Sequence, residues 1–215
     1  MVHFMYNVMF SLFSYICVIS GCIFCAMMKE NSRSWLFTQL GLLGTIGADF
    51  FLVLLPVQQR VPGMVFFCFT QIFYFLRIYH EDKNAKRKRI HLIVRAIASA
   101  GALIVTPAVL GSRLDAVAVL SVFYYGNLFC NLVFAFCNFK ESKLFAFALL
   151  AFILSDTLLG FLSLSDYFLI ARGSLIYRIV RIGKNIFYPL YIVSQVSIPI
   201  SIVSKKIKTT STARL

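Results

Sequence analysis

Long runs of apolar residues, bounded by charged residues or proline, cover nearly the whole chain. A helix needs about 20 apolar residues to cross the hydrocarbon core of a membrane, and most of the runs have that length. They predict an all-α fold, a transmembrane bundle of seven or eight helices that forms a single domain over residues 1–204. The clearest helices are predicted near 5–28, 34–55, 62–79, 90–111, 114–138, 143–164 and 184–203.

Two segments have a less regular pattern. The stretch 166–184 is apolar but interrupted by basic residues, so an eighth span, a re-entrant turn and an interfacial helix are all compatible with it. The spacing of Arg178, Arg181 and Lys184 on one helical face favours an interfacial amphipathic helix. Residues 205–215 are basic and polar, and we expect a disordered cytoplasmic tail there.

The composition is that of a membrane protein rather than a water-soluble one. Of the 215 residues, 60% are hydrophobic and 13% are charged, a balance typical of chains whose solvent is lipid. Spans and short connections use up this length, so no separate globular domain is expected. The six cysteines lie in apolar runs, and Cys22 and Cys25 have neither a second pair nor a nearby histidine. No disulfide framework, metal site or other cofactor is therefore predicted.

Basic residues gather in alternate connections between the predicted helices. The net charge is +13, but a nucleic-acid partner is not expected, because Lys and Arg lie in short loops and the tail. The richer side should be cytoplasmic, which predicts an outer N-terminus and a cytoplasmic C-terminus, and the short loops favour a bacterial inner membrane. Six basic residues lie on the predicted outer side, namely Arg60, Arg113, Arg172, Arg178, Arg181 and Lys184. Fourteen lie on the predicted cytoplasmic side, namely Lys29, Arg33, Arg77, Lys83, Lys86, Arg87, Lys88, Arg89, Lys140, Lys143, Lys205, Lys206, Lys208 and Arg214.

Two aspartates interrupt the apolar runs. Asp49 lies shortly before the outer end of the second predicted helix, and Asp156 shortly before the outer end of the sixth. At 1.5 Å per residue, both carboxylates lie about 9–12 Å below the outer boundary. An ionisable group in hydrocarbon is costly, so such residues usually face the bundle interior and mark a site. We expect the two carboxylates to approach within about 8 Å and to act as the catalytic pair.

Uncharged polar side chains lie at a comparable depth on other helices. As candidate substrate-binding residues we select Gln71, Tyr74, Tyr124, Tyr191 and Gln195. The alternative is that such groups hydrogen-bond between helices and only hold the bundle together, as intramembrane Asn, Gln and Tyr do in structural proteins.

Other polar or small residues are interpreted as structural. Gly41, Gly44 and Gly47 line one face of the second helix and permit close approach by a neighbour. Arg95 lies in the first turns of its helix and is expected to extend to the headgroups. His91 flanks the basic loop and is expected to be solvated.

At these residues the chain resembles the YhhN-type, or lysoplasmalogenase-like, family of membrane proteins, over roughly residues 36–80 and 117–203. The resemblance implies an eight-helix fold and hydrolysis of the vinyl ether bond of lysoplasmalogens to an aldehyde and a glycerophospho headgroup. Gln71 stands where the family normally has histidine. The matching residues are Gly47-Ala48-Asp49, Gly63 leading to Gln71 and Tyr74, Ser155-Asp156, and Tyr191 with Gln195.

These features lead to three hypotheses. The first is a membrane hydrolase of a lysolipid, in which one of Asp49 and Asp156 protonates the vinyl ether carbon and the other orients water. Two carboxylates in a low dielectric cannot both ionise cheaply, so the pair would share one proton. The second is a transporter or proton-coupled carrier that uses the same aspartates, and the third is a non-catalytic lipid-binding protein. No sequence feature fixes the oligomeric state.

Overall fold

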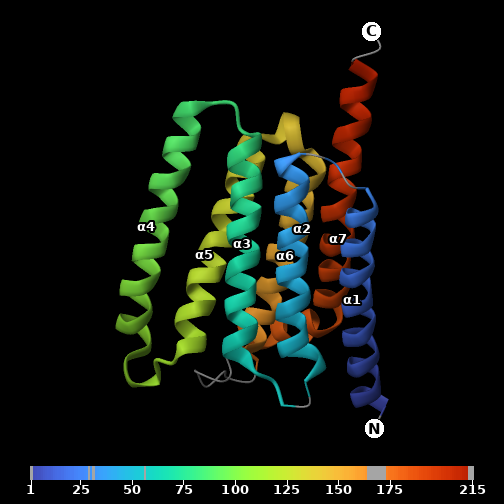
Figure 1. Cartoon of the computed structure of the whole chain (residues 1–215). Coiled ribbons are helices and arrows are strands. Elements are labelled where there is room, and N and C mark those ends of the chain that lie inside the picture. The colour runs from blue at the N-terminus through green and yellow to red at the C-terminus, as the bar shows by residue number, and fades with distance from the viewer. Residues whose placement is uncertain (1, 29, 31, 56, 164–172, 213–215) are drawn as a thin grey trace.

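The computed structural model describes residues 2–28, 30, 32–55, 57–163 and 173–212, and nearly all of them are helical. Successive helices run in opposite directions, with the described N- and C-terminal ends at opposite ends of the bundle (Figure 1). The predicted all-α helical bundle is confirmed. Its elements are α1 (Val2–Met27), α2 (Arg33–Asp49), the π-helix η1 (Phe50–Leu54), α3 (Arg60–Glu81), α4 (Ala85–Leu110), the 3₁₀ turn η2 (Gly111–Arg113), α5 (Ala116–Cys137), α6 (Phe139–Ser163) and α7 (Leu175–Thr212).

Seven helices in the described part of the chain are long and apolar enough to cross a membrane. They correspond in order to the seven clearest helices predicted from the apolar runs. The chain is therefore a multi-pass membrane protein.

The main differences from the sequence prediction lie around the last span. Residues 175–184 form the start of α7 instead of a separate interfacial helix, and Gly183 packs against Leu158 of α6. The remainder of that stretch, up to residue 172, lies outside the described residues. At the other end α7 continues to Thr212 where a disordered tail was predicted, because the lysines after Ser204 are good helix formers and no proline or glycine stops them.

Side-chain caps explain where several helices begin. The side chains of Ser32, Asn84 and Asp115 accept hydrogen bonds from backbone N–H groups in the first turns of α2, α4 and α5. Such caps satisfy N–H groups that have no partner within the helix. The capping residues in the short loops therefore fix where these three helices begin.

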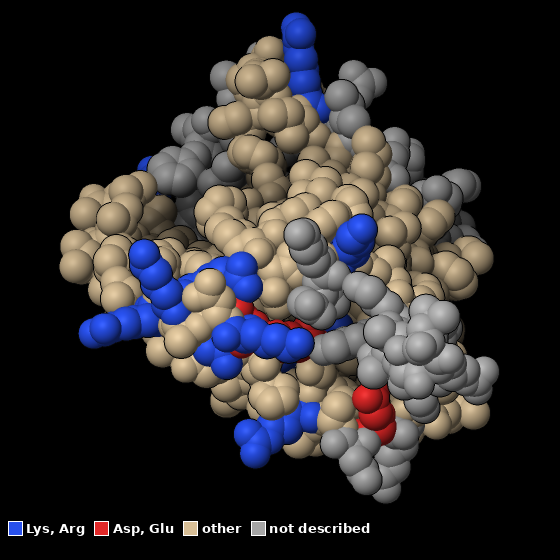
Figure 2. Space-filling view, turned by 90° about the horizontal axis from the view of Figure 1, so that it is seen from above, with Lys and Arg blue, Asp and Glu red and all other residues tan. Residues whose placement is uncertain are grey.

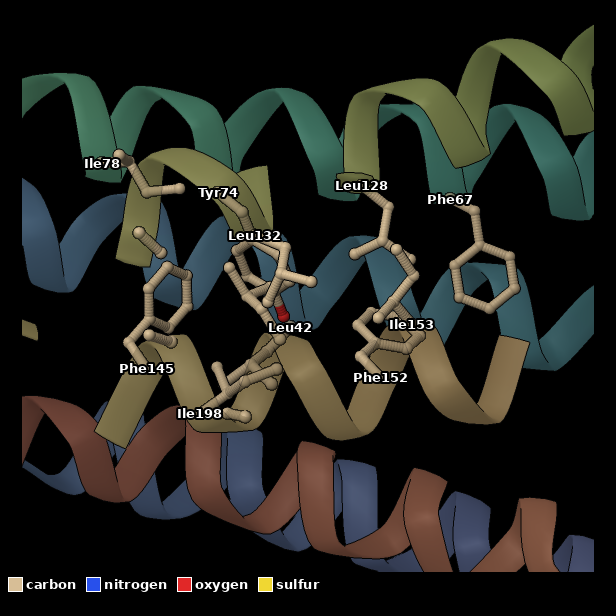
Figure 3. Close-up of a cluster of buried hydrophobic side chains, with 14 of the residues drawn as sticks. Leu42, Phe67, Tyr74, Ile78, Leu128, Leu132, Phe145, Phe152, Ile153 and Ile198 are labelled. Atoms are coloured by element: carbon tan, nitrogen blue, oxygen red, sulfur yellow. The ribbon is translucent and has the colours of Figure 1, made fainter. Parts of the chain in front are cut away.

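The helices pack around a core to which α1, α2, α3, α5, α6 and α7 all contribute buried side chains. Helix α4 lies at one edge and packs mainly on α5, while α1 lies at the other edge against α7 and α2 (Figure 1). The buried core side chains of α3, α5 and α6 point toward one another in Figure 3, with Phe67 and Phe152 towards one end and Phe145 towards the other. The outer surface of α4 carries exposed Leu, Ile and Val side chains, as a lipid-facing helix does.

Close contact between α2 and α3 depends on the glycine face predicted from sequence. A Cβ atom on Gly41 would lie 2.3 Å from the Tyr74 ring, and one on Gly44 would lie 2.6 Å from the Thr70 hydroxyl. On Gly47 a Cβ would lie 2.6 Å from the ring of Phe66. The prediction that these glycines permit close approach by a neighbour is confirmed.

The C-terminal end of the bundle gathers positive charge. Seen from that end, Lys and Arg side chains surround a small acidic area (Figure 2). Asp82, in the loop between α3 and α4, accepts hydrogen bonds from Arg87 on both carboxylate oxygens. Arg87 also donates to the Cys137 carbonyl at 2.8 Å, which ties this loop to the connection between α5 and α6.

Beneath that surface lies a buried ion pair. Arg77 is 1% exposed and pairs with Glu81 one turn along α3, with Nε and Oε1 3.3 Å apart. The Arg77 guanidinium also donates to Thr38 of α2 and lies 3.8 Å from the ring centre of Phe145. Arg77 therefore connects three helices at this end.

Candidate active site

Asp49 lies at a break in helix geometry. It is the last residue of α2, and the chain continues directly into the π-helix η1. A π-turn inside a helical span changes the direction of the following side chains and is frequent at functional sites. The Asp49 carboxylate is 4% exposed and accepts a hydrogen bond of 2.7 Å from the hydroxyl of Tyr191 on α7.

Asp156 has a matching arrangement on the other side of the bundle core. It lies in α6 and accepts a hydrogen bond from the hydroxyl of Tyr124 on α5. The preceding residue, Ser155, donates to the backbone carbonyl of Phe187 at 2.9 Å and so fixes α6 against α7. Asp156 is partly exposed, whereas Asp49 is buried.

Aromatic packing holds the two tyrosine–carboxylate pairs beside each other. Phe152, one turn before Asp156, packs against Tyr191 with ring centres 5.8 Å apart. Phe67 packs against Tyr124 at 5.3 Å and against Phe152 at 6.3 Å. Phe67 and Phe152 lie together between α3 and α6 in Figure 3.

The carboxylates interact through space. Asp49 and Asp156 lie within electrostatic range of each other, and the Tyr191 hydroxyl lies within range of both. Four helices, α2, α5, α6 and α7, thus bring two acids and two phenols into one polar group. Because both acids sit among aromatic rings, repulsion between them is weakly screened. One proton held by the pair removes that repulsion.

The other selected residues lie nearby but contact different partners. Gln71 is fully buried in α3, and its side-chain and backbone carbonyls both accept from the Asn131 amide at 2.9 Å. Tyr74 is fully buried against Gly41 and packs edge-on against Phe145. Neither side chain hydrogen-bonds a carboxylate in the described part of the chain.

Gln195 lies one turn beyond Tyr191 on α7 and is fully buried. Its amide Nε2 donates to the Ser194 hydroxyl at 3.2 Å. Its Oε1 atom has no hydrogen-bond donor among the described residues. Gln195 therefore offers a free acceptor one helical turn from Tyr191.

Tyr15 was not identified from the sequence. It lies on α1, is partly exposed, and has its hydroxyl within electrostatic range of Asp49. A tyrosine in a first span is an ordinary residue of membrane helices, so its sequence context gives no signal. Only the packing of α1 on α2 and α7 brings it there.

The structure corrects the interpretation of Arg95 and His91. Arg95 does not extend to the headgroups, since its guanidinium donates to the side-chain carbonyls of Asn127 and Asn131 on α5. His91 is 3% exposed, and its ring stacks on Phe134 with centres 3.8 Å apart. The direction of both side chains follows from the rotation of α4 about its axis. The sequence does not reveal this rotation, because the helix is apolar on all sides beyond Arg95.

A scan against protein families matches the chain to the YhhN family over residues 6–202. No curated protein and no solved structure matches the chain significantly. The match covers most of the chain and includes every residue of the candidate site. The resemblance noted from Asp49, Asp156 and their neighbours is thereby confirmed at the level of the family, and the chain belongs to the YhhN family.

Proposed function

We propose that the protein is a membrane-embedded hydrolase that cleaves the vinyl ether bond of a lysoplasmalogen. The observation that carries this proposal is the pair of carboxylates, Asp49 and Asp156, which lie within electrostatic range of each other while each accepts a hydrogen bond from a tyrosine. Paired carboxylates in unequal surroundings are the usual means of performing acid and base catalysis together.

The unequal burial of the two acids suggests their roles. Asp49 is the more deeply buried, and burial favours the neutral form of a carboxyl group, so we assign it as the acid. Asp156 is partly exposed and is the better placed to meet water, so we assign it as the base. Tyr191 and Tyr124 orient the two carboxyl groups, and the free acceptor of Gln195 is available to a substrate hydroxyl.

The assigned roles give a balanced reaction. The Asp49 proton moves to the vinyl carbon distal to the ether oxygen, which leaves an oxocarbenium ion and the Asp49 carboxylate. Water adds to the cationic carbon and gives one proton to Asp156, forming a hemiacetal. The hemiacetal then breaks: Asp156 protonates the departing glycerol oxygen while Asp49 takes the hydroxyl proton. The products are an aldehyde and a glycerophospho alcohol, and both acids regain their starting state.

Gln71 replaces the histidine that the family resemblance leads one to expect, but its contacts make this compatible with catalysis. The Gln71 side chain accepts from Asn131 and hydrogen-bonds neither aspartate in the described part of the chain. The proposed proton transfers therefore need no titrating group at this position.

The test uses purified protein in detergent with a lysoplasmalogen as substrate. Asp49→Asn and Asp156→Asn are each expected to abolish release of aldehyde, because an amide neither donates the required proton nor accepts one from water. Phe129→Leu, at an exposed lipid-facing position of α5, is the matched control and should remain active. Flux of an unmodified solute in proteoliposomes without aldehyde would support the transporter instead. Lipid binding without turnover would support the non-catalytic alternative.

We also propose that the basic end of the bundle faces the cytoplasm. This orientation rests on the excess of Lys and Arg in the connections at the C-terminal end, and it places the N-terminus outside. The bacterial inner membrane stays a prediction from the short loops. Impermeant labelling of a cysteine introduced at Lys83 should require membrane disruption in intact cells, whereas one introduced at Gln59 should not. The reverse pattern would contradict the orientation.

A further inference from the structure

A second polar group lies between α3, α4 and α5, and we name it the Arg95 cluster. Arg95 donates to the side-chain carbonyls of Asn127, at 2.5 Å, and Asn131. It contacts His91 Nε2 at 3.3 Å and lies over the Phe75 ring, 4.3 Å from its centre. Asn131 in turn donates a hydrogen bond of 2.9 Å to the side-chain carbonyl of Gln71. The cluster consists of Gln71, His91, Arg95, Asn127 and Asn131.

The Arg95 cluster carries a positive charge that no contacting carboxylate balances. Arg95 belongs to neither of the ion pairs Arg77–Glu81 and Arg87–Asp82, and none of its contacts described above is with a carboxylate. Its polar contacts are amide carbonyls and an imidazole. A charge within a membrane span is costly and usually pairs with an opposite one or marks a binding site.

The cluster also has more donors than acceptors. The carbonyl oxygens of Asn127, Asn131 and Gln71 each accept a hydrogen bond. By contrast, Arg95 Nε and Gln71 Nε2 are buried and have no acceptor in the described part of the chain. Gln71 itself is fully buried. Buried polar groups normally have hydrogen-bond partners. The surplus donors and the positive charge are therefore suited to bind an anionic ligand group that carries several acceptor oxygens.

The position of the cluster relates it to the two carboxylates. Tyr124, which donates to Asp156, and the cluster residues Asn127 and Asn131 all lie on the buried face of α5. At 1.5 Å per residue, the two asparagines lie about 4.5 Å and about 10.5 Å further along the helix than Tyr124. This is the length scale of a glycerol backbone, which separates the ether oxygen of a lysophospholipid from its phosphate.

We propose that the Arg95 cluster binds the phosphate of the lipid whose vinyl ether bond meets Asp49 and Asp156. This inference rests on the proposed function and adds to it the part of the substrate that is recognised. Arg95 and the Gln71 amide donate to phosphate oxygens, and Asn127 and Asn131 hold the guanidinium in place. A neutral single-chain ether lipid would leave the charge and both donors without a partner, so the site selects phospholipids.

Binding of two unreactive lipids tests the proposal without any hydrolysis. The first is a saturated 1-O-alkyl lysophospholipid, which has no vinyl bond, and the second is the 1-O-alkylglycerol of equal chain length, which has no phosphate. The wild-type protein in detergent should prefer the phospholipid by on the order of tenfold or more, since hydrogen bonds to a charged group exceed ordinary ones. Inorganic phosphate alone should bind weakly, and binding as tight as that of the lysophospholipid would overturn the assignment to a lipid.

Two variants test whether the preference for the phospholipid depends on the Arg95 cluster. Arg95→Gln should remove the preference for the phospholipid, whereas Arg89→Gln, an exposed position on the same helix, makes the same change of charge and should keep it. If Arg95→Gln does not fold, Gln71→Glu offers a second route, because its carboxylate would neutralise Arg95 inside the protein and also repel phosphate. An unchanged preference in a folded Arg95→Gln or Gln71→Glu variant would overturn the proposal.

The two proposals fail in different ways. A preference that depends on Arg95, in a protein that never releases aldehyde, would refute the hydrolase and leave a phospholipid site. Aldehyde release by a wild-type protein that binds both lipids equally would refute the phosphate site and leave the hydrolase.

Discussion

Replacing Gly41 by alanine should separate α2 from α3 at their closest contact. The new Cβ atom would lie 2.3 Å from Cε1 and 2.8 Å from Cδ1 of Tyr74. The ring cannot swing away freely, because Tyr74 is fully buried and packs against Phe145 with ring centres 5.6 Å apart. Restoring an ordinary carbon–carbon contact requires a shift of about 1 Å.

The size of the effect follows from overpacking. Forcing an extra methyl group into a close-packed interior costs about 1–3 kcal/mol. Alanine also favours a helix over glycine by about 1 kcal/mol, which partly offsets that cost. Gly126→Ala on α5 is the matched control, because a Cβ at Gly126 meets nothing within 4 Å. Subtracting the change in stability of Gly126→Ala from that of Gly41→Ala cancels the helix preference of alanine and leaves the packing cost.

Thermal unfolding in detergent measures this difference, with monodispersity after heating as the readout. We expect Gly41→Ala to have the lower midpoint and Gly126→Ala to equal or exceed the wild type. Tyr74→Leu removes the ring, so Gly41→Ala should cost little in that background. If Gly41→Ala proves as stable as Gly126→Ala, the close contact between α2 and α3 does not exist as described.

Three further changes have defined outcomes. Tyr191→Phe removes a hydrogen bond to a buried carboxyl group, which is worth about 1.5–3 kcal/mol. We expect kcat for aldehyde release to fall by about tenfold or more while the protein stays folded. An unchanged kcat would show that the hydroxyl does not orient Asp49. Although burial opposes ionisation of Asp82, the hydrogen bonds from Arg87 and the Asn84 N–H outweigh it and hold the Asp82 pKa below its ordinary value of 3.8. The stability that the ion pair contributes is therefore complete above about pH 4 and is lost as the pH falls through the lowered pKa. The thermal midpoint of Asp82→Asn should lie below that of the wild type at pH 6, and the two midpoints should converge as the pH falls towards 3. A difference between the midpoints that does not change with pH would contradict the assignment. Arg77→Gln breaks a buried ion pair and its contact with the Phe145 ring, and should lower the free energy of unfolding by about 3 kcal/mol or more in a denaturant titration, whereas a loss below about 1 kcal/mol would mean that the pair is not buried as described.

The architecture was open to prediction because lipid imposes a simple rule. Each span must be apolar over a fixed length, so clusters of charged residues mark most of the connections. The second to fifth helices accordingly begin and end within about five residues of their predicted bounds. The glycine face of α2 was predictable for a related reason, since Gly41, Gly44 and Gly47 recur with helical spacing and only small residues permit such close packing.

The site was less open to prediction because depth along a helix is easier to infer than rotation about it. Matched depth suggested that Asp49 and Asp156 meet, and they lie within electrostatic range of each other. The same reasoning grouped Gln71 with the aspartates, but that side chain bonds to Asn131. Nothing in the sequence marks the change from α-helix to π-helix after Asp49, because the residues that follow it are ordinary apolar ones.

Arg95 shows the same limit most clearly. An arginine about three turns into a helix can either extend to the headgroups or pair with polar groups within the bundle. The spacing of Asn127 and Asn131, four residues apart on one face of α5, was the available signal for the second choice. That signal has meaning only once α4 and α5 are known to be neighbours.

Isotope incorporation tests the proposed acid catalysis most directly. Turnover of a lysoplasmalogen in D₂O should place one deuterium on the carbon next to the aldehyde carbon, because the first step delivers an exchangeable proton from the Asp49 carboxyl group to that position. Mass spectrometry of the promptly reduced product measures this, and Asp49→Asn should yield no product. Prompt release of an aldehyde that carries no deuterium, or an equal rate from Asp49→Asn, would contradict protonation of the vinyl ether by this carboxylate pair.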